Sequence, residues 1–272
     1  MESNEAGGRS ENDFITINSP VDSFDASAIF HVVTGVLGFA LYMHQQIPSI
    51  LDDIFLEFEM LKMEHHELEL ILMQREVKSS SRRVHAGKMR EVKSCIRRLE
   101  KLMKTVSNVH TALQSMISVI PNVQRVLLVI GSSPTRPQHI YEICFSHGGI
   151  PIGRVHDFTK SRIGEGLSRK AIRALISKGA GSETCCGPSK LFLLVQAPSS
   201  FYSPLHFLPK RDFKYNKKIV PFRLRFRCRN QPHDSAIANS MRLADSDSSD
   251  LIWFQCRYAI KGLPSKTSTS EE

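Results

Sequence analysis

The stretch ISVIPNVQRVLLVIG, residues 117–131, marks the point at which the sequence changes from a helical to a strand pattern. Before it, apolar residues recur every three or four positions from Met89 to Met116, which is typical of one long amphipathic helix that ends before Pro121. After it, Val123–Ile130 is rich in β-branched residues and ends in a turn at Gly131. The change of period indicates a chain that contains both helices and strands.

Two further helices are predicted before this stretch. Ala28–Gln46 is apolar on nearly every face and follows Asp25, a typical cap residue, so we expect a buried helix there. Gly35 and Gly38 within it permit the close approach of a neighbouring element. Residues 49–77 show a second apolar stripe at three- to four-residue spacing.

Most of the predicted strands follow the stretch. His139–Phe145, Leu191–Gln196 and Leu251–Ala259 have strand patterns, and Gly166–Lys178 reads as a helix between them. Lys210–Arg229 is predicted to form a hairpin. Helices first and strands mostly later favour the α+β class in one domain, with long helices packed on a mostly antiparallel sheet.

Segments rich in polar residues indicate where the folded domain begins and ends and where it contains loops. Residues 1–24 read as a flexible leader, 25–263 as the folded domain and 264–272 as a flexible tail. Inside the domain, 78–90 is predicted to be a mobile basic loop and 230–250 a polar loop.

The net charge of +9 is concentrated in two segments. Arg75–Lys104 holds eleven basic residues against three Glu, and Lys210–Arg229 holds nine against Asp212, so each carries +8 and the rest of the chain −7. Such segments can bind nucleic acid, a membrane surface or an acidic protein, or they can be ordinary solvated faces.

Several classes of protein are unlikely on composition. Six scattered cysteines are too few for a disulfide scaffold, so we expect a reducing compartment and unpaired thiols. The N-terminal residues lack the basic region of a signal peptide. The best apolar run, Ala28–Met43, falls short of the length that usually spans a bilayer, so no membrane partner is expected.

Motifs for catalysis are not found in the sequence. There is no phosphate-binding glycine loop, no nucleophile elbow and no zinc-ligand spacing, since His65 and His66 are adjacent and point about 100° apart on a helix. We therefore predict a protein that is not an enzyme, with no catalytic residue, metal or cofactor.

The alternation at Phe222–Arg229 is compatible with binding to nucleic acid. Arginine stands at every second position, at Arg223, Arg225, Arg227 and Arg229, and such a row could meet phosphates. Phe222 and Phe226 alternate onto the opposite face and are expected in the core rather than as a stacking platform. We therefore keep binding to nucleic acid or to the chromosome axis as an alternative function of the protein, although we do not favour nucleic acid as its partner.

Three stretches match motifs that occur together in one known family. Leu251–Gly262 contains I-W-F-Q followed by K-G, similar to the family's C-terminal signature. Tyr42–Pro48 resembles the end of its first helix, Y-x-x-Q-Q-L-P. Residues 120–142 resemble its P-R-V-L-I-L-L-G strand, proline-bearing turn and Y-E strand. Order and spacing agree over residues 28–262, so the chain resembles the comet family, in particular its plant-type members. These are HORMA-fold proteins that bind the spindle-checkpoint protein mitotic-arrest-deficient two.

The resemblance implies a HORMA-like fold with a C-terminal strand folded back across the sheet. It also implies an adaptor in the nucleus and cytoplasm that recognises the closed conformer of checkpoint HORMA proteins. Such an adaptor presents its client to an AAA+ ATPase that remodels it, which promotes silencing of the spindle assembly checkpoint. In meiosis the same module is expected to act on chromosome-axis HORMA proteins.

The resemblance also implies partner-binding residues. The family's partner-facing helix corresponds to Gly166–Lys178, and its central aromatic anchor falls on Ile172, with Arg169 and Arg173 beside it. At the first-helix end, Gln45 and Gln46 match family glutamines. The leader is implied to contact the ATPase through its acidic residues Glu2, Glu5, Glu11 and Asp13.

Overall fold

A computed structural model describes residues 14–73, 79–120, 122–146, 162–182, 187, 189–216, 218–229 and 250–263. These residues form four helices and seven strands. The helices are α1 (Ala26–Met43), α2 (Leu51–Met73), α3 (Ser79–Val119) and α4 (Arg162–Ser177). The strands are β1 (Phe14–Asn18), β2 (Arg125–Ser133), β3 (Arg136–Ser146), β4 (Lys190–Pro198), β5 (Phe207–Lys210), β6 (Phe222–Arg227) and β7 (Leu251–Lys261).

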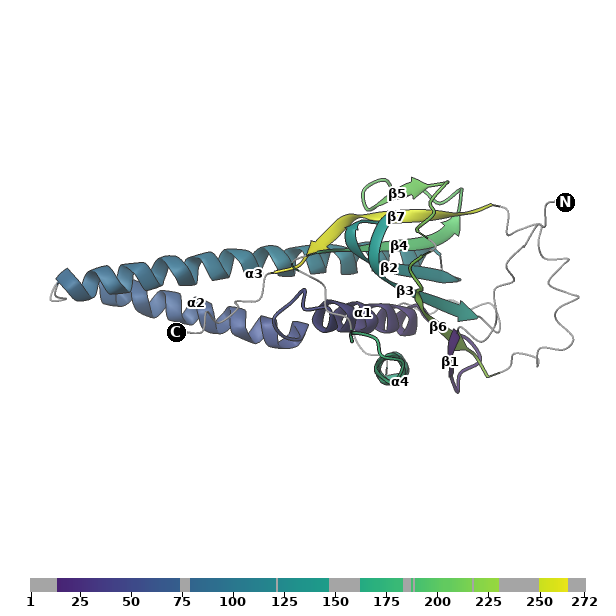
Figure 1. Cartoon of the computed structure of the whole chain (residues 1–272), viewed down its shortest axis with the longest axis horizontal. Coiled ribbons are helices and arrows are strands. Elements are labelled where there is room, and N and C mark those ends of the chain that lie inside the picture. The colour runs from purple at the N-terminus through teal and green to yellow at the C-terminus, as the bar shows by residue number, and fades with distance from the viewer. Residues whose placement is uncertain are drawn as a thin grey trace, which may run out of the picture.

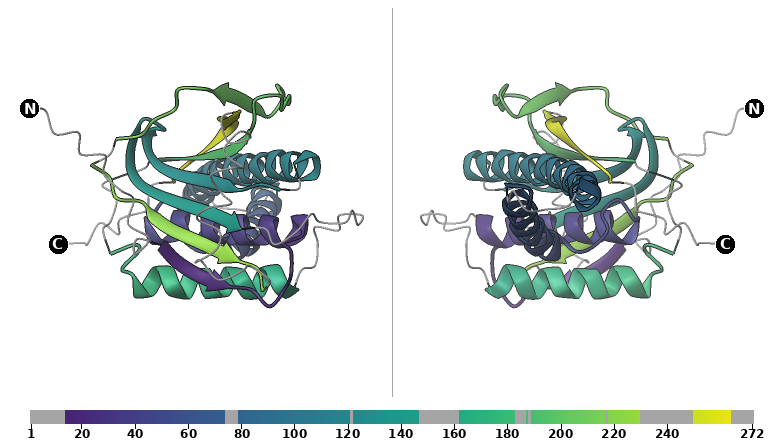
Figure 2. Two further views of the ribbon diagram at one scale, coloured as in Figure 1. Left: turned by 90° about the vertical axis from the view of Figure 1, so that its right-hand side faces the viewer. Right: turned by 90° about the vertical axis from the view of Figure 1, so that its left-hand side faces the viewer.

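The elements are arranged in layers around one sheet. α1 and the C-terminal half of α3 cover one face of the sheet, and α4 lies beyond α1, farther from most of the strands (Figure 1). The end-on views show the same order of sheet, α1 and α4 (Figure 2). α2 and the N-terminal half of α3 project away from these layers as an arm (Figure 1). The α+β class predicted from the sequence is confirmed.

The seven strands form one mostly antiparallel sheet in the order β1-β6-β3-β2-β4-β7-β5. The pairs from β3 through β2, β4 and β7 to β5 are antiparallel, whereas β1, β6 and β3 run parallel to one another. The sequence neighbours β6 and β7 are therefore separated in the sheet by three strands.

Apolar residues fill both faces of the central strands. In β2, Val126 and Leu128 face the helices and belong to the main core, whereas Leu127 and Val129 belong to a smaller cluster on the opposite face. Partly buried residues of 213–219 pack against that smaller cluster. Burial on both sides explains why β2 reads as a continuous apolar run rather than as an alternation.

α1 is the central helix of the main core. The carboxylate of Asp25 accepts a hydrogen bond from the backbone N–H of Ala28 at 2.7 Å, which confirms the predicted cap. By length and hydropathy, α1 alone among the described helices could cross a membrane, contrary to the sequence estimate, but 67% of it is buried inside the fold. That degree of burial is typical of a core helix.

The predicted mobile loop at 78–90 is wrong, because α3 begins at Ser79. The Arg82 guanidinium donates a hydrogen bond to the carbonyl oxygen of Leu72 at the end of α2 (3.0 Å), and Lys88 pairs with Glu64 of α2 at 2.8 Å. This segment lacks an apolar stripe, and its described contacts to α2 are this hydrogen bond and this ion pair.

The predicted leader is wrong for residues 14–24. β1 adds to the edge of the sheet beside β6, and Phe24 is buried against Phe145 and Phe226. A five-residue strand carries too little local pattern to be found without its partner. Residues 1–13 lie outside the described residues, as do 230–249 of the predicted polar loop and the predicted tail 264–272.

The hairpin predicted at Lys210–Arg229 is also wrong. β5 pairs with β7, and β6 lies between β1 and β3 at the other side of the sheet. The strict alternation of β6 is the pattern of a strand with one apolar face, and it does not identify the neighbouring strands.

Candidate partner-binding surface

α4 is attached to the rest of the fold through a stripe of small and apolar side chains. The stripe packs on α1, and a short contact at its centre joins Gly35 and Ser168: a Cβ at position 35 would lie 1.9 Å from the Ser168 Oγ atom. The prediction of a close neighbour is thereby confirmed at Gly35, whereas a Cβ at Gly38 would make only an ordinary contact, 3.5 Å from the Leu51 Cδ1 atom. The buried residues of the stripe are Gly164, Leu167, Ser168, Ala171 and Leu175.

The opposite face of α4 is exposed and basic. Its charged residues are Arg162, Glu165, Arg169, Lys170 and Arg173, so four positive charges face one negative charge. Arg169 pairs with Glu165 at 3.4 Å, but both side chains are at least half exposed, so this ion pair stabilises the helix only slightly. The face suits a partner of negative charge.

Ile172 lies at the border between the two faces. Its side chain is partly buried and packs against the main core, whereas Arg169, about one turn before it, and Arg173, the next residue, are exposed. Two other apolar side chains of α4, Ile163 and Ile176, are exposed. The structure thus brings the three predicted residues of this helix together on one flank, with Ile172 serving partly as a core residue.

The two glutamines predicted to bind a partner differ in their exposure to solvent. Gln45 is exposed and has a positive φ of 54°, which turns the chain away from α1. Gln46 is 1% exposed, and its amide donates to the carbonyl oxygen of His44 at 2.8 Å and accepts from the backbone N–H of Ser189. Gln46 therefore has no surface to offer a partner, and the reason is that its hydrogen bonds are used inside the fold.

Gln46 holds the C-terminal strand in place. Its backbone carbonyl accepts a hydrogen bond from Leu263 at 2.8 Å, and a Cβ at Gly262 would lie 2.2 Å from its Oε1 atom. The N–H of Gly262 also donates to Ser189 at 2.9 Å. The end of β7 is thus tied to the end of α1, a link between residues more than 200 positions apart.

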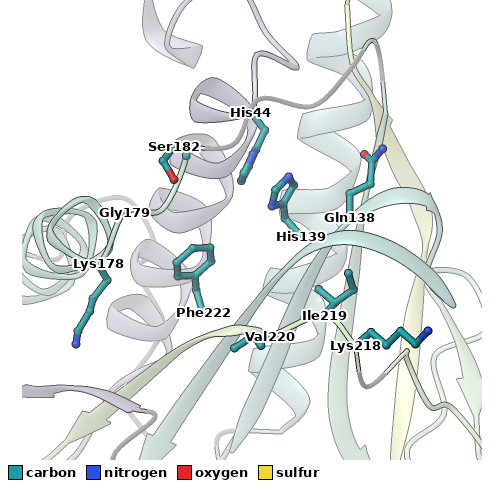
Figure 3. Close-up of a pocket in the computed structure, with 11 residues that line it drawn as sticks. His44, Gln138, His139, Lys178, Gly179, Ser182, Lys218, Ile219, Val220 and Phe222 are labelled. Carbon is teal, nitrogen blue, oxygen red and sulfur yellow. The ribbon is translucent and has the colours of Figure 1, made fainter.

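A pocket of about 410 Å³ lies beside this link, where α1 and α4 end. In Figure 3 the rings of His44 and His139 face each other, and the ammonium ends of Lys178 and Lys218 point away from them. The two imidazole rings stack with centroids 3.8 Å apart, and the His44 Nε2 atom lies 2.7 Å from the Tyr141 hydroxyl. These contacts fix the turn that carries Gln45 and Gln46.

The sequence did not predict this histidine pair. A polar residue at the end of an otherwise apolar helix is the one signal that could have drawn attention to His44. His139 alternates with buried residues on β3 and shows no comparable signal. Among the residues that the structure describes, no group of three or more His, Cys, Asp or Glu side chains is placed to hold a metal ion.

The arginine row of β6 is largely occupied within the fold. The Arg223 guanidinium donates to the Glu142 carboxylate at 3.1 Å, and its side chain is 15% exposed. The Arg225 guanidinium lies 4.0 Å from the centre of the Phe14 ring. Because β1 and β3 flank β6, these guanidiniums meet protein groups rather than an open groove.

Glu142 was missed in the sequence, although a lone acidic residue in an apolar strand is a usable signal for a buried ion pair. Its carboxylate also lies 4.0 Å from Arg125. Burial, and secondarily the Glu142 charge, raise the pKa of the neighbouring Cys144 thiol to about 11. This thiol is therefore protonated and unreactive at neutral pH.

No known family model matches the chain, and no curated protein is significantly similar to it in sequence. Its function is therefore argued from the motifs and from the geometry of this surface.

Proposed function

We propose that this protein is an adaptor of the comet type, with a HORMA-like fold, that binds the closed conformer of a checkpoint or meiotic HORMA protein. It presents that client to an AAA+ ATPase, which remodels it and so promotes checkpoint silencing and the recycling of meiotic HORMA proteins. The observation that carries the proposal is α4, whose inner face is buried on α1 and whose basic outer face is exposed.

The positions of the three quoted stretches support this proposal. They lie at the end of α1, from the end of α3 into β3, and along β7. The first and the last of them touch, through the hydrogen bond from Leu263 to Gln46 and the close approach of Gly262 to the same side chain. Motifs that resemble one family and that contact one another across the fold are better explained as parts of one unit than as separate chance matches.

The geometry of α4 favours a helical partner. A helix with one face buried and the other exposed can pack against a second helix by its outer ridges. Here the partner would meet Ile172 and Ile176 at the centre and place acidic residues against Arg169 and Arg173. Apolar contacts at the centre and charges at the rim are the usual pattern of protein interfaces.

The proposed contact with the ATPase is assigned to residues 1–13. Their acidic side chains suit a basic pore, and the segment precedes β1, which is anchored in the sheet. The protein would act in the nucleus and the cytoplasm, where its clients and the ATPase meet.

A binding experiment with the two client conformers tests the proposal. Size-exclusion chromatography should show co-elution of the full chain with the closed conformer of mitotic-arrest-deficient two and little with the open conformer. The double variant Arg169→Glu/Arg173→Glu should weaken the complex by about tenfold or more, because it places like charges against the partner. Equal or absent binding to both conformers would contradict the proposal.

A matched control separates this function from the alternative. Arg97→Glu/Arg98→Glu makes the same change of charge on α3, where both residues are exposed. The adaptor proposal expects this variant to bind the client normally. If the chain is instead a nucleic-acid binder, this variant should lose affinity for DNA, and the wild-type affinity should fall steeply with salt. The exposed basic face of α3 is the better candidate for that role, since Arg223 and Arg225 are engaged inside the fold.

A further inference from the structure

The arm formed by α2 and α3 carries an apolar stripe that the fold leaves exposed. α2 packs on α3 through an inner seam of Ile54, Phe58, Leu61 and Leu68. The outer stripe consists of Leu56, Met60, Met63 and Leu70. Each outer residue follows an inner one by two positions, which is about 200° around a helix, so the two sets lie on opposite faces.

The outer stripe is solvent-exposed over its whole length. The four side chains are between 50% and 69% exposed. The arm projects away from the sheet, so no described strand or helix approaches this side of α2 (Figure 1). Leu56, Met60 and Met63, at the spacing 4 and 3, form a helix-packing surface, and Leu70 lies on the same face two turns further on; exposed apolar surface of this kind marks a binding site.

Acidic residues border the stripe. α2 contains seven carboxylates and a single lysine between Leu51 and Met73. Glu57 and Glu64 stand beside the stripe on one side and Glu59 on the other, and Glu67 lies within its line. Glu59 and Glu64 also form exposed ion pairs with Lys62 (2.9 Å) and Lys88 (2.8 Å), which a basic partner would have to displace. Flexible methionine side chains flanked by carboxylates suit an amphipathic helix that carries basic residues.

A second copy of this chain does not provide such a helix. In a symmetric α2–α2 pair the same acidic borders would face each other, and like charges repel. α3 is basic, but its outer face is polar: Arg90, Lys93, Arg97, Arg98, Lys101 and Lys104. The outer face of α3 therefore has the positive charge, but it lacks the apolar residues that would pack on the outer stripe of α2.

We infer that the outer stripe of α2 binds an amphipathic helix of another protein, with apolar residues at i, i+4 and i+7 and with lysine or arginine at its borders. This surface is separate from α4, and the inference does not depend on the proposed adaptor function. It would give the protein a second partner, bound on the arm.

A pair of designed peptides tests the inference directly. One is an 18-residue helix with leucine at the three- and four-residue spacing and lysine at its borders; the other has glutamate in place of every lysine. Fluorescence anisotropy with the full chain should show binding of the basic peptide and at least tenfold weaker binding of the acidic one. The affinity should also fall as salt is raised, since the border charges are exposed.

Two variants make the test specific. Met60→Gln/Met63→Gln removes apolar surface from exposed positions, so the chain should stay folded and bind the basic peptide about tenfold more weakly or worse. Leu205→Gln, at an equally exposed position on the body, should not change the binding. Thermal unfolding of each variant confirms that it is folded.

Three results would overturn the inference. Equal binding of the two peptides, or binding that survives the methionine replacements, would show that the stripe is not the site. Sedimentation that finds a dimer of the wild-type chain, and a monomer of the Met60→Gln/Met63→Gln variant, would show that the stripe is an interface between copies of this chain.

Discussion

The carboxylate of Glu142 explains why the arginines of β6 do not form an open anion-binding row. It is 10% exposed and lies within 4.0 Å of both Arg223 and Arg125. Breaking a buried ion pair from one side costs about 3–5 kcal/mol, so Arg223 is held in the fold rather than released to a ligand. Alternating charged residues along a strand share one face of the sheet. The residues beside them on the neighbouring strands decide whether a ligand can reach those charges.

His110 makes stability depend on pH. It lies on α3 against the Phe30 ring, its Nε2 atom is buried without a hydrogen-bond partner, and burial lowers its pKa below 6.5. Below pH 6.5 the unfolded chain gains a proton that the folded chain resists, so the free energy of unfolding falls as the pH is lowered. The slope from this group is at most about 1.4 kcal/mol per pH unit.

The variant His110→Leu isolates this contribution. Urea unfolding at pH 7.5 and pH 5.5 should show the stability of the variant relative to wild type rising as the pH falls, because leucine cannot take up the proton. A difference between the two proteins that is the same at both pH values would contradict the assignment.

Single residues were predictable from the sequence where their role is local. Asp25 caps the helix that follows it, and a glycine on a buried helix permits a close neighbour, although the sequence does not show that this neighbour is α4. The partners of Gln46 and Glu142 were not predictable, because Ser189 and Arg223 are 143 and 81 positions away. The sequence spacing carries no information about such contacts.

At the scale of elements, the packing of α4 on α1 depends on the absence of a side chain at Gly35. In Gly35→Val the new side chain would overlap Ser168, so α4 must shift away from α1. The expected loss of stability is about 1–3 kcal/mol, measured as a lower midpoint in urea. A variant as stable as wild type would contradict the close contact.

Gly87 is the matched control for this change. It lies in α3 with no atom within 4 Å of a Cβ built there. Gly87→Ala should therefore stabilise the protein by about 0.5–1 kcal/mol, since alanine loses less backbone entropy in a helix.

Elements with a strong local pattern were found where the sequence placed them, and those defined by their partners were not. The long apolar period of α3 and the β-branched run of β2 were sufficient to predict a helix and a strand at these places. The first ten residues of α3 lack an apolar stripe and are helical because Lys88 and Arg82 contact α2. β1 is a strand because β6 pairs with it, and five residues do not encode such a partner.

At the scale of the molecule, the fold separates two surfaces. α4 lies against the helical layer beside the sheet, and the outer stripe of α2 lies on the projecting arm (Figure 1). The two have opposite charge, basic on α4 and acidic on α2. A protein built in this way offers two separate surfaces that suit partners of opposite charge.

The arm is also expected to open independently of the sheet. Leu68 of α2 and Val92 of α3 are buried, but they lie outside both apolar clusters that involve the sheet. Leu68→Ala should remove about 2–3 kcal/mol of packing from the arm alone. The strands β2 and β4, which are buried on both faces, should keep their stability because none of their contacts changes.

Hydrogen exchange followed by mass spectrometry measures the two parts separately. In the wild-type chain, amides of α2 after Phe58 should exchange faster than those of β2 and β4, since regions with few buried contacts open most readily. In Leu68→Ala, exchange should accelerate in the second half of α2 and in the facing part of α3, with β2 and β4 unchanged. An equal acceleration in the sheet would mean that the arm and the sheet unfold as one unit. The helix α2 would then open no more readily than the strands of the core.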